Sequence, residues 1–303
     1  MLPRMMAQPV RYRSDDEDSA RWNEFPFRDG DIVISTRSKS GTTWMQMICA
    51  LLVFQTPDLP APISELSPWL DWLVTPRDEV YALLAAQEHR RFIKTHTPLD
   101  GVPIDPRATY VVVARDPLDV AVSLYPQRDN IDREVWRERI GQAAPAEPPP
   151  PRPPAREWLL EWIESDADPR ADLDSLPGIM WHLSDAWARR DAPNVRLVHY
   201  AALSEDLDRE MRRMAAGLGI DVSEAAWPRL VGAASFEHMR ANADLTAPAP
   251  AGILKDRVAF FRGGVSGAGR DLLTDGEVAR YRERAAELAP PELLTWLHAE
   301  TFG

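Results

Sequence analysis

A short loop at residues 36–44, TRSKSGTTW, has the residue types of an anion-binding site. It offers a positive charge, several hydroxyl groups and a glycine that lets the backbone approach a ligand closely. These residues are Lys39, Ser40, Gly41, Thr42 and Thr43. An apolar run follows at once, so the loop would lie at the N-terminus of a helix, where unpaired N–H groups attract anions. The loop by itself is equally consistent with an ordinary helix start.

This loop differs from the nucleoside triphosphate loop, whose pattern is G-x-x-x-x-G-K-[ST]. Thr42 stands where the lysine after the second glycine would be, and Thr36 or Arg37 occupies the region of the first glycine. In a triphosphate loop the lysine reaches the phosphates and the final hydroxyl binds magnesium. The sequence therefore disfavours a magnesium-dependent triphosphate site.

Arg115 and Ser123 form a second candidate anion site. Arg115 ends a β-branched run, and Ser123 lies eight positions later on a helix that we expect to begin near Pro117. Arginine at the end of a buried strand costs free energy unless an anion or a carboxylate meets it. The residues alone leave open whether that partner is a ligand or part of the protein.

His96 is a candidate general base. Of the six histidines, it alone ends a strand-like run, RFIKTH, among polar and basic neighbours. Histidine titrates near neutral pH and can remove a proton from an alcohol or a phenol in the transition state. A hydrogen-bonded structural histidine is the commoner alternative, and the residue by itself does not decide between the two.

These motifs, in this order, resemble those of the cytosolic sulfotransferases. KSGTTW at 39–44 matches the family's 5′-phosphosulfate loop in full, although Ser38 stands where the family usually has proline. Residues 115–123, which end in DVAVS, match the 3′-phosphate motif of Arg, seven residues and Ser. The pattern Lys-x-His-x-Pro at 94–98 resembles the catalytic K-T-H-L-P, with Thr97 in place of leucine.

The resemblance implies a mechanism as well as a ligand. The donor would be 3′-phosphoadenosine 5′-phosphosulfate, the product 3′,5′-adenosine bisphosphate, and no metal would be needed. His96 would be the general base for a hydroxyl acceptor, Lys39 would stabilise charge on the bridging oxygen, and Lys94 would face the sulfonate oxygens. Sulfuryl transfer, like phosphoryl transfer, depends on in-line positioning and charge stabilisation, which suits these residue types.

Two segments of the C-terminal half extend the resemblance. Tyr200 would lie near the adenine, and SFEHM at 235–239 matches a family segment that lines the nucleotide pocket. The late loop FRGGVSGAG matches only in part, because Gly263 replaces a lysine and Ala268-Gly269 replaces an Asp-Trp pair. We therefore expect weaker donor affinity and a more mobile loop. The resemblance assigns the nucleotide site to Lys39, Ser40, Gly41, Thr42, Thr43, Trp44, Arg115, Ser123, Tyr200, Ser235, Phe236, Met239, Arg262, Gly263 and Gly264.

The elements that must position these residues alternate between strands and helices. Buried runs predict strands at 31–36, 91–96, 109–115 and 195–200. Periodic patterns predict helices at 43–54, 77–86, 119–125, 179–190 and 207–218, and Thr274 with Glu277 predicts a capping box. Alternation of this kind favours a three-layer αβα architecture with a central, mostly parallel sheet, in which ligands bind at the carboxyl ends of the strands. The resemblance makes this the P-loop-like sulfotransferase fold.

The chain of 303 residues reads as one domain at 28–303, with a flexible acidic segment at 1–27 leading into it. Prolines dominate PAEPPPPRPP at 145–154, which predicts an extended surface insertion, either a spacer loop or a flap over the substrate entrance. The resemblance covers about residues 28–300 and is strongest to actinobacterial members, some of which sulfate glycolipids.

Composition limits the partners. The net charge of −12 argues against nucleic acid or anionic membrane as a general partner. A single cysteine, Cys49, excludes an internal disulfide, and no apolar run approaches the ~20 residues of a membrane span, so we expect a cytoplasmic protein. A homodimer is left open.

The acceptor side is the least defined part of the site. Trp69, Leu70, Trp72 and Leu73 follow a turn, and Tyr125 follows the second phosphate motif, so an apolar alcohol, phenol or glycolipid is expected, although these residues suit a core equally well. Two other functions compete with sulfonate transfer. One is a nucleotide-binding, kinase-like protein, and the other is a protein that binds adenosine bisphosphate without catalysis.

Overall fold

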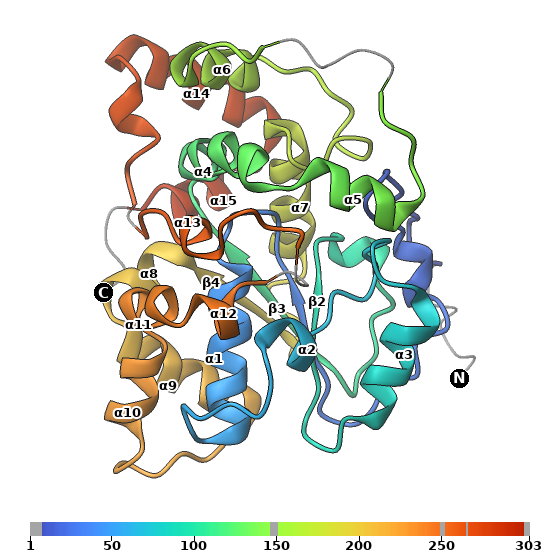
Figure 1. Ribbon diagram of the computed structural model, residues 1–303. Coiled ribbons are helices and arrows are strands. Elements are labelled where there is room, and N and C mark those ends of the chain that lie inside the picture. Colours follow the sequence, from blue (N-terminus) through green and yellow to red (C-terminus); the bar gives the residue numbers. More distant parts are fainter. Residues whose placement is uncertain (1–7, 146–150, 249–251, 265, 300–303) are drawn as a thin grey trace, which may run out of the picture.

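A four-stranded parallel sheet forms the centre of the molecule, in a computed structural model that describes residues 8–145, 151–248, 252–264 and 266–299 (Figure 1). The strand order is β2-β1-β3-β4, and each neighbouring pair is parallel. The strands are β1 (Ile32–Ser35), β2 (Phe92–Thr95), β3 (Thr109–Ala114) and β4 (Val195–His199). The predicted parallel α/β architecture is confirmed, and each strand lies inside a predicted run.

Helices cover both faces of this sheet, because successive strand residues point to opposite faces. Val33 and Ile93 belong to one buried cluster, with residues of the helices α3 (Arg77–Ala86), α4 (Pro117–Asn130), α7 (Leu176–Ala188), α14 (Asp275–Leu288) and α15 (Pro291–Leu297). Ile32 and Ile34 belong to the other, with residues of α1 (Thr42–Phe54), α8 (Tyr200–Glu205), α9 (Leu207–Leu218) and α10 (Trp227–Ala233). The arrangement is the predicted three-layer αβα.

The remaining helices are short and lie around the edge and the carboxyl ends of the sheet (Figure 1). They are α2 (Ile63–Leu66), α5 (Arg133–Ile140), α6 (Ala155–Ile163), α11 (Phe236–Ala241), α12 (Ala243–Thr246) and α13 (Arg257–Phe260). None of these was predicted, because helices of four to nine residues carry little periodic signal. The predicted capping box at Thr274 and Glu277 is present at the start of α14.

The carboxyl ends of the three neighbouring strands β2, β1 and β3 carry the motif residues. His96 follows β2, the loop that contains Lys39 follows β1, and Arg115 follows β3. In the register, Ser35 lies beside Thr95, and Ile34 lies beside both Lys94 and Val111. Parallel strands end at the same edge of a sheet, so this register brings the three motifs to one place.

The N-terminal segment differs from the flexible segment that we expected. The side chains of Tyr12, Trp22 and Phe25 are buried. The acidic residues turn back in a short hairpin, in which Arg13 pairs with Asp18, and Glu17 pairs with Trp72 in antiparallel fashion. The buried aromatic side chains hold this segment against the domain, although its acidic residues had suggested flexibility.

Part of the proline-rich insertion is anchored to the domain. Residues 146–150 lie outside the described part of the chain. Beyond them, the Arg152 guanidinium lies over the Tyr125 ring at 4.4 Å and donates to the Tyr125 carbonyl oxygen. The Tyr125 hydroxyl in turn donates to the carbonyl oxygen of Pro153 at 2.9 Å. The end of the insertion is therefore held against α4 just after Ser123.

No helix in the described ranges combines the length and the apolar character that a membrane crossing requires. Cys49 is buried in α1, as expected of an inert thiol, and burial raises its pKa to about 12.

Candidate active site

The loop after β1 leaves the N-terminus of α1 open to a ligand. Gly41 is the N-cap residue, with φ of 100°, and it has no side chain that could cap the first turn. The first N–H groups of α1 are therefore available to an anion, which also benefits from the positive end of the helix dipole. Lys39 has φ of 60°, a region that residues other than glycine seldom adopt and that costs on the order of 1 kcal/mol. Strain of this kind is typical of functional loops.

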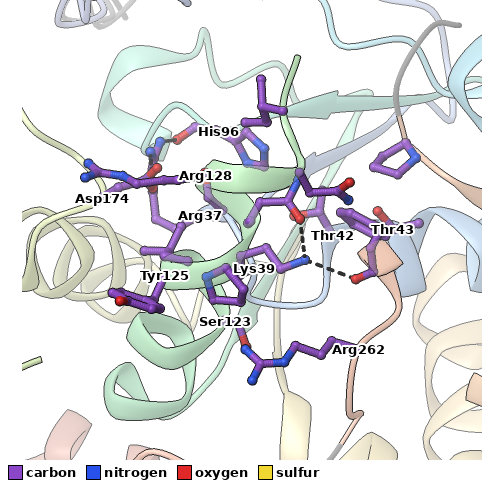
Figure 2. Close-up of a pocket in the computed structure, with 18 of the residues that line it drawn as sticks. Arg37, Lys39, Thr42, Thr43, His96, Ser123, Tyr125, Arg128, Asp174 and Arg262 are labelled. Carbon is purple, nitrogen blue, oxygen red and sulfur yellow. Dashed lines mark hydrogen bonds and ion pairs between the residues drawn. The ribbon is translucent and has the colours of Figure 1, made fainter. Parts of the chain in front are cut away.

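The Lys39 ammonium group lies in a confined, cationic environment. Its Nζ donates to Gln127 Oε1 and to the carbonyl oxygen of Phe260, both at 3.4 Å (Figure 2). It also lies 3.8 Å from the centroid of the Phe260 ring. Desolvation is the main cause that lowers the pKa of Lys39 to about 7, and the positive charges of Arg115 and Lys94 contribute in the same direction. An anion placed among these three cations would relieve their mutual repulsion.

Arg115 joins the second motif to the first. Its Nη1 donates to the carbonyl oxygen of Lys39 at 3.0 Å and to Ser123 Oγ at 3.1 Å. The Arg115 side chain is buried and lies over the ring of Tyr200, with its Cζ atom 4.4 Å from the centroid. Arg115 and Ser123, predicted to act together, are therefore in direct contact.

Tyr200 packs against residues of both motifs. A methyl group in place of the Gly41 hydrogen would lie 2.9 Å from Tyr200 Cδ2, so only glycine fits the loop here. The Trp44 ring meets the edge of Tyr200 at a centroid distance of 5.2 Å, and Trp44 Nε1 donates to the carbonyl oxygen of Ala234 at 2.8 Å. Tyr200 is thus a packing partner of the anion loop and of Arg115, in addition to lining the same cavity.

His96 is held with one nitrogen facing the protein. Its Nδ1 forms a hydrogen bond with the carbonyl oxygen of Thr36. Because a carbonyl oxygen only accepts, Nδ1 carries the proton and Nε2 keeps its lone pair. Burial lowers the pKa of His96 well below its usual value, with further lowering from Lys94 and Arg37, while the Thr36 bond opposes the change. The imidazole is therefore neutral near pH 7, as a proton acceptor must be.

Trp69 organises the side chains between His96 and Lys94. Its ring meets the His96 ring edge-on at 4.4 Å, and Lys94 Nζ lies 4.0 Å from its centroid. On its other side Trp69 stacks on Trp72 at 4.8 Å and 11°. Burial lowers the pKa of Lys94 to about 8, although the nearby carboxylates of Glu17 and Asp71 raise it.

The late loop borders the same cavity. Arg262, Gly263 and Gly264 all line it, and Arg262 is exposed at its rim. Figure 2 shows Arg262 on the side of Lys39 where Ser123 lies. Gly264 has φ of 65°, and an added methyl group would lie 2.7 Å from the Phe236 ring, so the loop packs on α11 at this point.

Two residues predicted for the nucleotide site lie outside the cavity lining, and so do Leu70 and Leu73, which were expected on the acceptor side. Ser40 is buried, and its backbone N–H donates to the carbonyl oxygen of Arg37 at 3.2 Å. Ser235 uses its hydroxyl to accept from the His238 N–H as the N-cap of α11. The other predicted residues line one cavity: Lys39, Gly41, Thr42, Thr43, Trp44, Lys94, His96, Arg115, Ser123, Tyr200, Phe236, Met239, Arg262, Gly263 and Gly264. The roles of all these residues stay predictions at this point.

The cavity has a volume of about 1480 Å³, more than a typical small-molecule site of ~300–1,000 Å³. One half carries the cations and glycines of the three motifs. The other half has an aromatic and mixed-charge lining, which includes Trp69, Trp72, Trp136 and Ile253 together with charged side chains. Its size and two-part lining suit two ligands bound end to end.

Sequence reasoning missed three charged residues of this second half. Arg37 is buried, donates to the carbonyl oxygen of His96, and pairs with Asp174 at 2.7 Å. Glu17 Oε2 lies 3.9 Å from the Arg37 guanidinium, and burial raises the pKa of Glu17 to about 8. Arg37 stands two residues before Lys39, which was the one available signal. The other two come from distant segments that no local pattern links to the site.

In the ranges that the structure describes, no three His, Cys, Asp or Glu side chains cluster in a way that could hold a metal ion. The anion-binding groups of the cavity are instead lysines, arginines, hydroxyls and backbone amides, which suit phosphate or sulfate oxygens.

The chain is similar in sequence to known sulfotransferases. The family described as "Sulfotransferase domain" matches residues 29–289. A glycolipid sulfotransferase of Mycobacterium bovis (strain BCG) is 42% identical, and the match covers 98% of this chain and 97% of the relative. Human sulfotransferase 2B1 is 27% identical over 88% of this chain and 68% of the human protein.

Two solved structures have a similar fold. Retinol dehydratase in a complex with retinol and PAP has a TM-score of 0.65 and 21% identity, covering 94% of this chain and 86% of that chain. Mouse sulfotransferase SULT7A1 complexed with PAP has a TM-score of 0.61 and 21% identity, covering 89% of this chain and 88% of that chain. At such low identity, these two likenesses bear on the fold.

Proposed function

The chain belongs to the sulfotransferase domain family and is a transferase that delivers a sulfonate group to a hydroxyl acceptor; we propose that the donor is 3′-phosphoadenosine 5′-phosphosulfate, that the acceptor is a glycolipid, and that His96 is the general base. The observation that carries the proposal is the contact of Arg115 with both Ser123 and the Lys39 carbonyl. That contact joins two separate anion-binding motifs into one site, as a donor with phosphates at two positions requires.

The residues of the donor half fit this nucleotide. The open N-terminus of α1 and the Lys39 ammonium group would bind the 5′-phosphosulfate, while Arg115 and Ser123 would bind the 3′-phosphate. Trp44 and Phe236 border the cavity where an adenine would stack. Before the donor binds, the pKa of Lys39 is near 7; two bound anionic groups would raise it and keep the ammonium group charged.

The transfer would proceed in line between acceptor and donor. His96 Nε2 takes the proton from the acceptor hydroxyl as the new O–S bond forms. The bond between sulfur and the bridging oxygen breaks, and the phosphate of 3′,5′-adenosine bisphosphate leaves with the electron pair. Lys39 stabilises the negative charge on that bridging oxygen, and Lys94 stabilises the sulfonate oxygens. One such donor is worth on the order of 10²- to 10³-fold in rate.

The acceptor half supports a glycolipid. The relative at 42% identity is named for a glycolipid acceptor. Trp69 and Trp72 stack on each other beside His96 and line the cavity, and Glu17 and Asp174 bring carboxyl groups to the same lining. Aromatic faces and hydrogen-bonding side chains together are suited to a ligand that has apolar and polar parts.

The proposal is tested first by ligand binding and then by transfer. Thermal-shift titrations with 3′,5′-adenosine bisphosphate, ATP and NADPH should give a rise in Tm with the bisphosphate, because a ligand that binds the native state stabilises it. A shift with ATP and none with the bisphosphate would favour the kinase-like alternative. Radiolabelled sulfonate should then pass from the donor to an alkyl glycoside. Bisphosphate binding without transfer to any glycoside, phenol or alcohol would favour the non-catalytic alternative.

Two further expectations from the sequence stay predictions: the absence of nucleic-acid partners and a cytoplasmic location. The sequence leaves a homodimer open.

A further inference from the structure

Asp119 makes two hydrogen bonds that the proposed function does not use. Its carboxylate accepts from the backbone N–H of Gly267 at 2.8 Å and from that of Gly269 at 2.9 Å. The side chain is buried, and both of its oxygens are engaged in these bonds. Asp119 therefore ties α4 to a loop about 150 positions later in the chain.

An ordinary role at a helix start does not account for these contacts. Acidic residues in a first turn often stabilise the helix dipole. In α4 the N-cap function belongs to Asp116, whose carboxylate accepts from the Leu118 N–H at 2.8 Å. Asp119 lies one turn before Ser123 on the same face of the helix and points its carboxylate at the late loop instead.

The loop is shaped to meet this carboxylate. Gly269 is buried, and an added methyl group would lie 2.3 Å from the backbone carbon of Leu118. Gly267 has φ of 93°, a conformation that L-residues rarely adopt. Gly269, which replaces the tryptophan of the family motif, therefore allows the loop backbone to lie directly on α4, which is a different consequence from the greater mobility expected from the small residues of this loop.

We infer that Asp119 is a positioning residue for the donor: it fixes the late loop on α4 so that Arg262 and Gly264 border the cavity near Arg115 and Ser123. The inference rests on the proposed donor. Charge-assisted hydrogen bonds from two amides hold a loop more firmly than contacts with neutral groups. A loop that is fixed beforehand loses less conformational freedom when the nucleotide binds.

The contact between Asp119 and the late loop compensates for a cation that this chain lacks. Gly263 stands where the family has a lysine, so the loop brings one cation fewer to the 3′-phosphate. With Arg262 and the loop amides already fixed, nucleotide binding costs less conformational entropy, and this offsets part of the affinity lost with the cation. Asp119 is not expected to touch the donor.

Asp119→Asn tests the inference from the helix side. Asparagine keeps the size of the side chain, but its amide group would face one of the two loop N–H groups. We expect the Kd for 3′,5′-adenosine bisphosphate, measured by calorimetry, to rise roughly tenfold or more. Trypsin cleavage after the exposed Arg262 and Arg270 should accelerate. With saturating donor, kcat should change much less than the donor KM does.

Gly269→Ala tests it from the loop side, where the added methyl group collides with α4 and Asp119 is intact. This variant should show the same rise in bisphosphate Kd and the same faster cleavage. In the double variant the Kd should rise little beyond that of either single variant, because both substitutions disrupt the same contact between Asp119 and the late loop. Asp206→Asn is the matched control: Asp206 accepts from one backbone N–H as the N-cap of α9, away from the cavity. It should leave the bisphosphate Kd and the cleavage rate unchanged.

Two outcomes overturn the inference: a folded Asp119→Asn protein with the wild-type bisphosphate Kd, or fully additive effects in the double variant. If the variants do not fold, amide hydrogen exchange of the unmodified chain still tests the inference. Without nucleotide, the Gly267 and Gly269 amides should exchange hydrogen slowly; rapid exchange of both also overturns it. If the unmodified chain fails to bind the bisphosphate although these amides are protected, the proposed function fails and the contact with Asp119 stands.

Discussion

The Arg115 guanidinium donates a hydrogen bond to the carbonyl oxygen of Lys39 at 3.0 Å, and so the 3′-phosphate motif holds the backbone of the 5′ loop. Lys39 is the residue of that loop with the uncommon φ of 60°. Its peptide group needs a partner to stay in this conformation, and Arg115 supplies one. The conformation of the 5′ loop therefore depends on Arg115, a residue of the 3′-phosphate site.

This connection predicts different behaviour for the two partners in the 3′-phosphate site. Arg115→Ala should weaken binding of both 3′,5′-adenosine bisphosphate and adenosine 5′-phosphate, because it removes a phosphate ligand and also releases the Lys39 loop. Ser123→Ala should weaken only the bisphosphate, because Ser123 accepts from Arg115 and the bond from Arg115 to the Lys39 carbonyl oxygen is kept. Loss of a charged hydrogen-bond partner is worth roughly 10- to 100-fold in Kd. Calorimetric titration of both variants with both nucleotides is the test; unchanged binding of the 5′-phosphate to Arg115→Ala would contradict the connection.

Bisphosphate affinity should depend on pH through Lys39. The pKa of this lysine is near 7 in the free protein, and a bound anion raises it, so binding takes up a proton. Affinity is then highest below pH 7 and falls by up to about tenfold per pH unit above it, until the pKa of the complex is reached. Titration between pH 6.5 and 9 measures this slope. Lys39→Met should bind more weakly at pH 6.5 and lose most of the slope, whereas an unchanged slope would assign the proton to another group.

His96→Ala should lower kcat by about 10²- to 10⁴-fold, the usual contribution of a general base. Bisphosphate Kd should stay near the wild-type value, because the His96 side chain contacts Thr36 and Trp69, whereas the donor phosphates are assigned to Lys39, Arg115 and Ser123. His182→Ala is a useful comparison, since this second buried histidine lies beside Ser35 and is not among the residues that line the cavity. Single-turnover assays with the glycoside acceptor measure the rate of transfer separately from nucleotide binding. Equal transfer rates for wild type and His96→Ala would show that His96 is not the general base.

Glu17 should make the stability of the protein depend on pH. Burial raises its pKa from 4.5 to about 8, so the folded chain holds a proton that the unfolded chain has released over this interval. Stability from this group is therefore lost as pH rises from about 4.5 to 8. Glu17→Gln should have a Tm close to that of the wild type at pH 4.5 and a higher one at pH 8. Glu24→Gln, in the same segment but exposed, should show no such difference in thermal melts.

Most of the sheet and the donor half of the site could be predicted from the sequence. Strands such as 109–115 are continuous apolar runs, which parallel strands buried on both faces require. Lys39, Arg115 and His96 each follow such a run, and their convergence follows from the shared edge of the sheet. These signals are local, and a sequence displays local signals directly.

In the acceptor half, Trp69, Trp72 and Tyr125 were expected from the sequence and line the cavity, but the charged residues could not be predicted. Glu17 reaches the cavity because Tyr12 and Trp22 anchor a segment whose charges suggested flexibility. From the sequence, Asp119 was only part of the predicted helix at 119–125 and of the DVAVS match, since its partners Gly267 and Gly269 lie far along the chain. Contacts of this kind depend on how separate segments pack together. No residue pattern within one segment records them.

The segment that carries Trp69 also serves the sheet itself. The Lys94 N–H donates to the carbonyl oxygen of Pro68 at 3.1 Å, and the Leu70 N–H donates to that of Lys94 at 3.2 Å, so these residues cover the open edge of β2. An uncovered edge is a template for aggregation. The backbone path of this segment is therefore constrained in evolution by solubility as well as by catalysis. New acceptor preferences would arise more readily from the hairpin around Glu17, where the exposed Arg13 and Ser14 line the cavity without covering the edge of β2.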